Sequence, residues 1–221
     1  MSRIESQIGY TFRNRVLLIT ALTHPSFAGD YHVESYQRLE FLGDAVLELY
    51  VSEALYKMHP DLSEGVLTRM RAELVCEETL SEAARKLGLD QDIRFSVGEE
   101  RSGGRNKPSI LCDVMEALIG GVYLDSGIEA AGRLIELAIG ENMRNHQPKA
   151  SHLDIKSSLQ ALLQSRGEMP VYELTSQSGP AHKPVFVYNV LVNGEIMGTG
   201  EGGSKQAAQT EAAKCALERL M

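Results

Sequence analysis

The sequence predicts two domains, an all-α domain followed by a small α+β domain with the element order α-β-β-β-α. Before residue 147, apolar residues recur at steps of three and four, which is typical of helices that bury one face. Later, a β-branched and aromatic run ends at Asn193-Gly194, a dipeptide typical of β-hairpins. Residues 147–152 are polar and contain a proline, as linkers often do. We therefore expect domains at residues 1–146 and 153–221.

The first domain is expected to contain five helices. The segments with helical spacing of apolar residues are 13–22, 38–59, 64–87, 109–124 and 128–144. Gly88 can end the third helix, because glycine readily adopts the left-handed conformation found at helix C-termini. The turn-forming residues Asp125, Ser126 and Gly127 separate the last two helices.

The second domain is expected to begin with a helix at residues 154–166. Strands are expected at residues 171–177, 185–192 and 195–200, the last two joined by the hairpin dipeptide. Gly200, Gly202 and Gly203 then predict a flexible bend. Ser204 can cap a closing helix at residues 205–220, because its hydroxyl can accept a hydrogen bond from a free amide of the first turn.

The charge of the chain narrows the function classes. The 221 residues carry a net charge of −8. Residues 1–146 hold 15 Lys and Arg against 23 Asp and Glu, and residues 147–221 hold 7 of each kind. Neither domain is basic, so a nucleic-acid-binding function has to rest on particular residues rather than on bulk charge. With 43% hydrophobic and 24% charged residues, the composition argues against disorder.

Cysteine usage and hydropathy indicate the compartment. The three cysteines are widely scattered and form neither a disulfide framework nor a paired zinc motif, which favours a reducing compartment. No apolar run approaches the roughly 18 residues of a membrane span. The N-terminus is too polar for a signal peptide. We therefore expect a cytoplasmic protein with no membrane partner.

One acidic pair lies in the segment QRLEFLGDAVLELY. Glu40 and Asp44 are four residues apart, so they share one face of the expected helix. A solvated polar stripe is an open alternative, because Gln37 and Glu48 continue the same face. Like charges at this spacing repel by about 0.2–0.5 kcal/mol, and no lysine or arginine shares the stripe.

A second acidic pair lies on a helix that is otherwise almost entirely apolar. Asp113 and Glu116 are three residues apart within SILCDVMEALIGGVYLD. A helix that is apolar nearly all round is a core helix, and charged carboxylates there are unfavourable without a cationic partner. A pair of divalent cations would satisfy them, since Mg²⁺ prefers oxygen ligands. The alternative is an ion pair with Arg69 or Arg71.

The two acidic pairs favour metal-assisted hydrolysis of a phosphate ester, whose oxygen atoms complete the coordination of a metal. Di-iron bundles expect Glu-x-x-His pairs, and none of the six histidines has a glutamate three positions before it. The sequence also lacks GxSxG, HExxH and the nucleotide-binding GxxxxGK[ST], so no nucleotide cofactor is expected.

Several motifs together resemble one family, bacterial ribonuclease III, an endonuclease that cuts double-stranded RNA. The segment RLEFLGDAVL at residues 38–47 resembles the family signature. The remaining segments follow in family order: ALTHPSF at 21–27, SEGVLTRMRAELV at 63–75, SGGRNKPSILCDVMEALIGGVYLD at 102–125, and a C-terminal module similar to double-stranded-RNA-binding domains. The resemblance covers nearly the whole chain.

The resemblance implies a homodimeric helical endonuclease that depends on Mg²⁺, with Mn²⁺ as a substitute. The catalytic metal ligands would be Glu40, Asp44, Asp113 and Glu116, with Glu40 and Glu116 binding the ion most directly. Glu64 matches a further acid that lines the cleavage valley. The products would carry 5′-phosphate and 3′-hydroxyl ends with a short 3′ overhang. The implied role is the processing of ribosomal, messenger, transfer and other structured RNA precursors.

The C-terminal module supplies candidate RNA contacts. An A-form duplex presents 2′-hydroxyl groups in a wide minor groove, so polar side chains and a nearby cation suit it. Ser157, Gln160 and Gln164 share one helix face, and His182 matches the family's second minor-groove contact. Lys205 begins the last helix, whose free amides can assist phosphate binding. Each side chain could instead simply be solvated.

Two positions depart from the family pattern. Gln37 stands where the family often has glutamate, and we expect activity to survive because the four metal-binding positions are intact. Gln206 stands where the family usually has a second lysine after the serine. The loss of one phosphate contact predicts weaker RNA affinity and a smaller salt dependence of binding.

Two other functions fit parts of the pattern. A non-catalytic RNA-binding scaffold would use the second domain but has no need of four carboxylates. A helical hydrolase of small phosphorylated molecules would use the metal chemistry but leaves the second domain without a purpose. The homodimer also has support in the residues, because Phe41, Leu42, Val46 and Tyr50 give the signature helix a large apolar surface. The open alternative is that the same residues fill an ordinary core.

Overall fold

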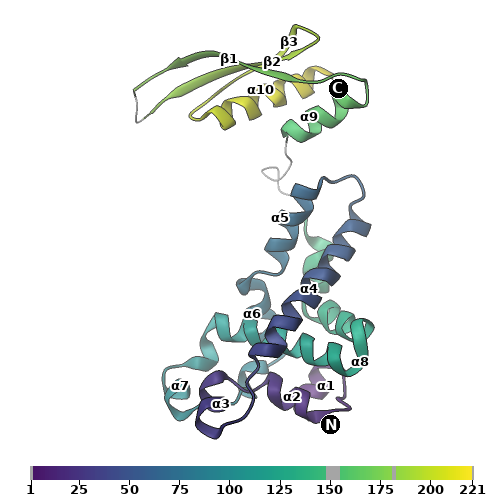
Figure 1. Cartoon of the computed structure of the whole chain (residues 1–221), viewed down its shortest axis with the longest axis vertical. Coiled ribbons are helices and arrows are strands. Elements are labelled where there is room, and N and C mark those ends of the chain that lie inside the picture. The colour runs from purple at the N-terminus through teal and green to yellow at the C-terminus, as the bar shows by residue number, and fades with distance from the viewer. Residues whose placement is uncertain (1, 148–154, 181–182, 221) are drawn as a thin grey trace. The chain divides into compact units, whose positions relative to one another are not determined.

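The structure is a computed structural model that describes residues 2–147, 155–180 and 183–220. It divides into two compact units, Met1–Gln147 and Pro148–Met221, each with its own hydrophobic core (Figure 1). Within the described ranges, no helix has the length and hydropathy needed to cross a membrane.

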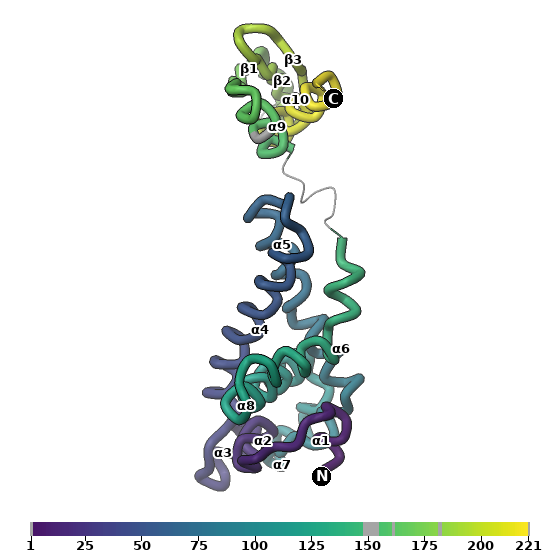
Figure 2. The backbone as a smooth tube through the Cα atoms, turned by 90° about the vertical axis from the view of Figure 1, so that its right-hand side faces the viewer, coloured from purple at the N-terminus to yellow at the C-terminus, as the bar shows by residue number. Residues whose placement is uncertain are grey.

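In the described part of the first unit the regular elements are helices, apart from one isolated β-bridge between Thr23 and Arg94. Two helices, α4 and α8, form its centre, and Figures 1 and 2 show them crossing. A sharp interruption at Gly127, with φ 78° and ψ −175°, divides α8 where the sequence predicts a break between two helices. The elements are α1 (Arg3–Ile8), α2 (Arg15–Ala21), α3 (Pro25–Tyr31), α4 (Gln37–Met58), α5 (Glu64–Leu74), α6 (Glu77–Lys86), α7 (Val97–Arg101) and α8 (Pro108–Asn145), with short 3₁₀ turns at Leu89–Gln91 and Gly104–Asn106.

The first half of α8 is the core helix that its composition predicts. Leu111, Val114, Met115 and Leu118 are completely buried between the neighbouring helices. Burial of such side chains contributes about 1.5–3 kcal/mol each to folding. This apolar surrounding is what makes the charged form of any acid on the same helix unfavourable.

The expected single helix at residues 64–87 is wrong, because the structure contains two helices there. Helix α5 ends at Leu74, and Cys76 has extended backbone angles of φ −71° and ψ 159° before α6 begins. Apolar spacing continues across this break, so periodicity alone could not reveal it. Glu77 and Glu78 mark the new helix start, since acidic residues are favourable near a helix N-terminus.

The second unit packs two helices on an antiparallel sheet with the strand order β1-β2-β3. Asn193 and Gly194 both have positive φ, at 51° and 85°, which confirms the tight hairpin turn. Its elements are α9 (Ile155–Gln164), β1 (Val171–Ser178), β2 (Val185–Val192), β3 (Glu195–Gly202) and α10 (Lys205–Leu220). The start of the predicted helix at residue 154 lies outside the described residues.

The expected flexible bend at Gly200, Gly202 and Gly203 is wrong for the first two residues, which belong to β3. A side chain at Gly200 would overlap the backbone of α10 at Ala208 and Ala212. Glycine is therefore needed here for close packing of a helix on a strand. The predicted cap is confirmed, since the amide of Ala207 donates to Ser204 Oγ at 3.1 Å.

Candidate metal centre and RNA-binding surface

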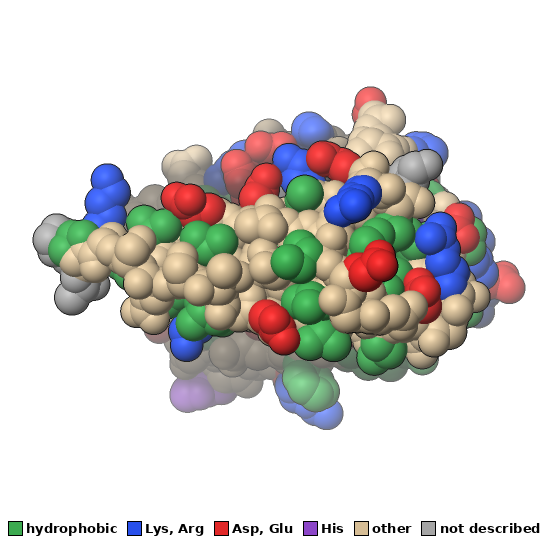
Figure 3. Space-filling view, turned by 90° about the horizontal axis from the view of Figure 1, so that it is seen from above, with side chains coloured by type: hydrophobic (Ala, Val, Ile, Leu, Met, Phe, Trp, Pro, Cys, Tyr) green, Lys and Arg blue, Asp and Glu red, His purple; other side chains and the backbone are tan. Residues whose placement is uncertain are grey.

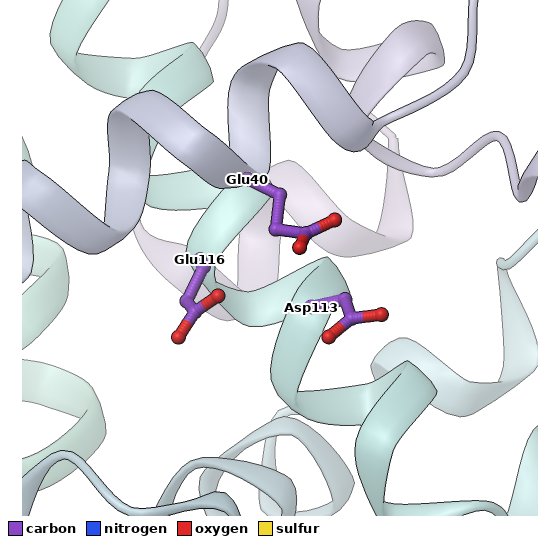
Figure 4. Close-up of side chains that lie close together, drawn as sticks. All are labelled: Glu40, Asp113 and Glu116. Atoms are coloured by element: carbon purple, nitrogen blue, oxygen red, sulfur yellow. The ribbon is translucent and has the colours of Figure 1, made fainter.

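Three of the four predicted carboxylates meet in one place. Glu40 on α4 and Asp113 and Glu116 on α8 each offer an oxygen atom, and these atoms lie within 4.8 Å of one another. All three side chains are partly buried. Figure 4 shows that the side chains from the two helices approach the same space. The crossing thus brings together acids that are more than 70 residues apart in the sequence.

A glycine contact between the helices sets this approach. Gly43 and Gly120 face each other where α4 crosses α8, and a side chain at either would overlap the backbone of the other helix. Because neither glycine has a side chain, the two backbones touch. Glu40 precedes Gly43 by about one turn, and Glu116 precedes Gly120 by about one turn. The contact therefore fixes how far apart the two acids lie.

The acids of the cluster repel one another. Burial, followed by the charges of Asp44, Asp113 and Glu40, raises the pKa of Glu116 to about 7. Burial and the charges of Asp113 and Asp44 also raise the pKa of Glu40. Burial raises the pKa of Asp113, while a hydrogen bond from Tyr36 acts in the opposite direction. The cluster therefore concentrates more negative charge than the neighbouring side chains neutralise.

The hydrogen-bond partners of the cluster are neutral groups. The Tyr36 hydroxyl donates to Asp113 Oδ2 at 3.1 Å, and the Cys112 thiol donates to Glu116 Oε1 at 3.8 Å. Across the described part of the chain, no lysine or arginine forms an ion pair with Asp113 or Glu116. Arg71, one of the expected partners, donates instead to Ser52 Oγ at 2.9 Å. The ion-pair alternative is therefore not supported.

The cluster fits a hard divalent cation. Its donor atoms are carboxylate oxygens, the ligands that Mg²⁺ and Mn²⁺ accept most readily. A bound cation would also relieve the mutual repulsion that raises the carboxyl pKa values. The oxygen ligands and the absence of a paired lysine or arginine among the described residues thus both favour a bound divalent cation.

The other two predicted acids lie outside this cluster. Asp44 is exposed and does not belong to the group of acids whose ligand atoms lie within 4.8 Å of one another, but its charge raises the pKa of both Glu40 and Glu116. Glu64 is exposed at the start of α5, where it accepts a hydrogen bond from Thr68 Oγ1 at 3.0 Å. It lines a hollow with Ser52 and Tyr56, near the far end of α4 from Glu40.

Most of the predicted RNA contacts lie on exposed positions of the second unit. Ser157, Gln160 and Gln164 are exposed on α9, whose opposite face buries Leu159 and Leu163 completely. Lys205 is exposed as the first residue of α10. The predicted contact His182 lies outside the described residues. Figure 3 shows acidic and basic side chains interspersed on the visible face, in keeping with the unit's balanced charge.

Comparison with known families identifies both units. Residues 14–143 match the family described as Ribonuclease-III-like, and residues 155–220 match the double-stranded RNA binding motif. The chain belongs to the ribonuclease III family. It is therefore an endoribonuclease with a double-stranded-RNA-binding domain, as the sequence motifs predict.

Individual relatives of the ribonuclease III family cover the chain well. Ribonuclease 3 of Carboxydothermus hydrogenoformans is 42% identical over 221 residues, which cover 98% of this chain and 94% of that protein. The crystal structure of the nuclease domain of ribonuclease III from Campylobacter jejuni is 41% identical, with a TM-score of 0.61, and covers 66% of this chain and 97% of that chain. A second structure of that domain, described for flexibility in a region involved in dimer formation, is 43% identical, with a TM-score of 0.59 and coverage of 63% and 98%.

The metal-dependent chemistry of this family requires an acidic site, and sequence reasoning missed both Tyr36 and Cys112, which contact it. Tyr36 immediately precedes α4 and donates to Asp113 across 77 residues of sequence. A tyrosine before a helix is usually part of the core, so its position carries no signal for this contact. Gln37, the departure from the family signature, is exposed, accepts from Ser35 Oγ at 3.3 Å and lies outside the cluster.

Proposed function

We propose that the chain hydrolyses phosphodiester bonds of double-stranded RNA with Mg²⁺ held by Glu40, Asp113 and Glu116. The observation that carries this proposal is the carboxylate cluster without a cationic side chain. When bound, the cation lowers the pKa of water and polarises the phosphate group. Asp44, at the exposed edge, completes the acidic set, and Mn²⁺ should substitute because it accepts the same ligands.

The two units would have separate roles, catalysis in the first and RNA binding in the second. Catalysis is assigned to residues 1–146, and RNA binding to residues 153–221 after a linker at 147–152. In the second unit, the exposed polar face of α9 would contact the minor groove, and Lys205 would contact phosphate. His182 keeps its role as a second minor-groove contact in this proposal. Glu64 is assigned to the wall of the cleavage valley.

A homodimer is the proposed active form. The Phe41 side chain on α4 is 80% exposed, which is unusual for a phenylalanine in a folded monomer. It borders a hollow of about 620 Å³ that Val16, Leu17, Leu42 and Leu124 help to line. A dimer would bury this apolar surface, and the related Campylobacter jejuni domain has a region described as involved in dimer formation.

Two active sites per dimer would cut the opposite strands of a duplex. The expected products have 5′-phosphate and 3′-hydroxyl ends with a short 3′ overhang. The expected substrates are precursors of ribosomal RNA and other structured RNAs, including messenger and transfer RNA, in the cytoplasm. The double-stranded-RNA-binding domain supports this class of substrate.

The test replaces Glu116 by glutamine, which keeps the size of the side chain and removes its charge. Glu116→Gln should lower the rate of cleavage of a long RNA duplex in Mg²⁺ by at least about 1,000-fold, because a metal ligand is lost. Binding of the same duplex, measured by gel shift without metal, should remain near that of the unmodified chain.

The matched control is Glu129→Gln, which changes an exposed glutamate on the same helix outside the cluster. It should cleave at the unmodified rate. Full cleavage by Glu116→Gln would contradict the assignment of the metal centre. Intact RNA after incubation of the unmodified chain with and without Mg²⁺ would instead favour the RNA-binding scaffold.

A further inference from the structure

We propose that Tyr36 is a positioning residue of the metal centre, which fixes Asp113 on α8 relative to Glu40 on α4. This inference rests on the proposed metal site. It concerns a side chain that does not itself bind the metal but holds two of the ligands in register. Three sets of contacts carry it.

The first contact joins Tyr36 to α8. The side chain is only 2% exposed, and its hydroxyl donates to Asp113 Oδ2 at 3.1 Å. A buried hydroxyl needs a partner, and a charged carboxylate acceptor makes a stronger hydrogen bond than a neutral one. This donor leaves the other carboxylate oxygen of Asp113 available to a cation. The contact therefore limits rotation of the carboxylate without neutralising it.

The second set of contacts joins Tyr36 to α4. Its backbone carbonyl accepts hydrogen bonds from the amides of Leu39 at 2.8 Å and Glu40 at 2.9 Å. The residue thus closes the first turn of the helix that carries Glu40. One residue is bonded through its backbone to the ligand from α4 and through its side chain to a ligand from α8.

The third set of contacts holds Tyr36 itself in place. Its backbone amide donates to the carbonyl of Thr23 at 2.9 Å, and its ring packs edge-on against His24, with centroids 5.7 Å apart. His24 is fixed in turn, because its Nδ1 accepts from the amide of Ser26 at 3.0 Å and its ring packs against Phe95. The hydroxyl is therefore presented from a rigid support.

This support matters because the three carboxylates repel one another before a cation arrives. Without a fixed donor, Asp113 would be free to rotate away from Glu40 and Glu116, and cation binding would have to restore its orientation. Groups that orient metal ligands in this way typically change metal affinity or activity by 10–100-fold. We expect an effect of that size from the Tyr36 hydroxyl alone.

The experiment removes only this hydroxyl. Tyr36→Phe in the full chain should bind Mn²⁺ about 10–100-fold more weakly, measured without RNA by the EPR signal of the free ion. The matched control is Tyr10→Phe, because the Tyr10 hydroxyl also donates to an aspartate of α8, Asp125 Oδ2, at 2.6 Å, but outside the cluster. It should bind Mn²⁺ as the unmodified chain does, and both variants should show cooperative urea unfolding.

A double-mutant cycle with Asp113→Asn separates positioning from a general structural effect. If Tyr36 acts through Asp113, Tyr36→Phe should weaken Mn²⁺ binding much less when Asp113→Asn is already present. Unchanged binding by Tyr36→Phe, equal losses in both tyrosine variants, additive losses in the cycle, or loss of folding in Tyr36→Phe would each overturn the proposal. If Asp113→Asn alone leaves Mn²⁺ binding unchanged, the proposed ligand set itself fails.

Discussion

At the scale of single residues, the carboxyl group of Glu116 is held where its charged form is unfavourable. Burial and three neighbouring acids raise its pKa from 4.5 to about 7. At a pH between the ordinary and the raised pKa, Glu116 keeps its proton in the folded metal-free chain but has released it in the unfolded chain. The free energy of unfolding therefore falls as the pH rises through this range.

The first prediction follows from this fall in the free energy of unfolding with rising pH. Without metal, Glu116→Gln should be more stable than the unmodified chain by about 1–2 kcal/mol at pH 8, after a discount for partial solvent access. At pH 4 the difference should nearly vanish, because the glutamate is then protonated in both states. Urea unfolding at the two pH values measures this, with Glu129→Gln as the control that should show no difference. An unmodified chain more stable than Glu116→Gln at pH 8 would contradict the repulsion that we describe.

The three acids that meet in the cluster could be predicted from the sequence, but the residues that contact them could not. Asp113 and Glu116 are conspicuous because the rest of their helix segment is apolar, and Glu40 lies in a recognisable signature. The contact of Tyr36 with Asp113 depends on how two helices cross, which no local pattern encodes. For the same reason the sequence treats Asp44 like the other acids, although the fold leaves it exposed.

At the scale of helices and strands, the glycine contact between α4 and α8 determines whether the centre can form. A methyl group on Gly120 would overlap the carbonyl oxygen of Leu39 and lie 3.0 Å from the amide of Gly43. Backbone atoms within a helix cannot move aside singly, so α4 as a whole would have to shift. Such a shift would carry Glu40 away from the two acids on α8.

Gly120→Ala is therefore predicted to lower the free energy of unfolding by about 1–3 kcal/mol and to weaken Mn²⁺ binding. Urea unfolding and EPR titration measure the two effects. Gly29→Ala is the matched control, since an added methyl group on α3 meets nothing within 4 Å. It should be neutral or stabilising by up to about 1 kcal/mol, because alanine favours helix. Normal Mn²⁺ binding by a folded Gly120→Ala chain would show that this contact does not set the ligand spacing.

The positions of elements could be predicted where the sequence changes its period or supplies a turn residue. The hairpin at Asn193-Gly194 and the break at Gly127 belong to this class. The break before α6 does not, because helical spacing continues through Val75 and Cys76. The sequence predicts a flexible bend at Gly200 and Gly202, which is wrong, because glycine serves both loose bends and tight packing. Only the presence of α10 distinguishes the two.

At the scale of the whole molecule, the two units differ in charge as well as in fold. All of the net charge of −8 lies in the first 146 residues, while the remainder is balanced. An acidic unit would repel RNA unless its acids are neutralised, which a bound cation would achieve at the cluster. The linker composition predicts the boundary between the units, because that signal is local. The proposed association of two chains has a weaker signal in the sequence, the apolar side chain of Phe41, which is 80% exposed on α4.

The final prediction tests whether Phe41 lies in the interface of the proposed dimer. Phe41→Asp should convert a dimer at micromolar concentration into a monomer, observed by sedimentation equilibrium. In a symmetric dimer the substitution acts twice, so losing even about 1.5 kcal/mol of apolar burial per copy weakens association by more than about 100-fold. Tyr56→Asp is the matched control at the other end of α4, where the side chain is 72% exposed, and it should remain dimeric. A dimer that survives Phe41→Asp would place the interface elsewhere, and a monomeric unmodified chain would exclude the homodimer. An exposed phenylalanine adds little to the stability of a single chain, so Phe41→Asp should leave the free energy of unfolding of the monomer unchanged. Loss of association can then be distinguished from loss of folding.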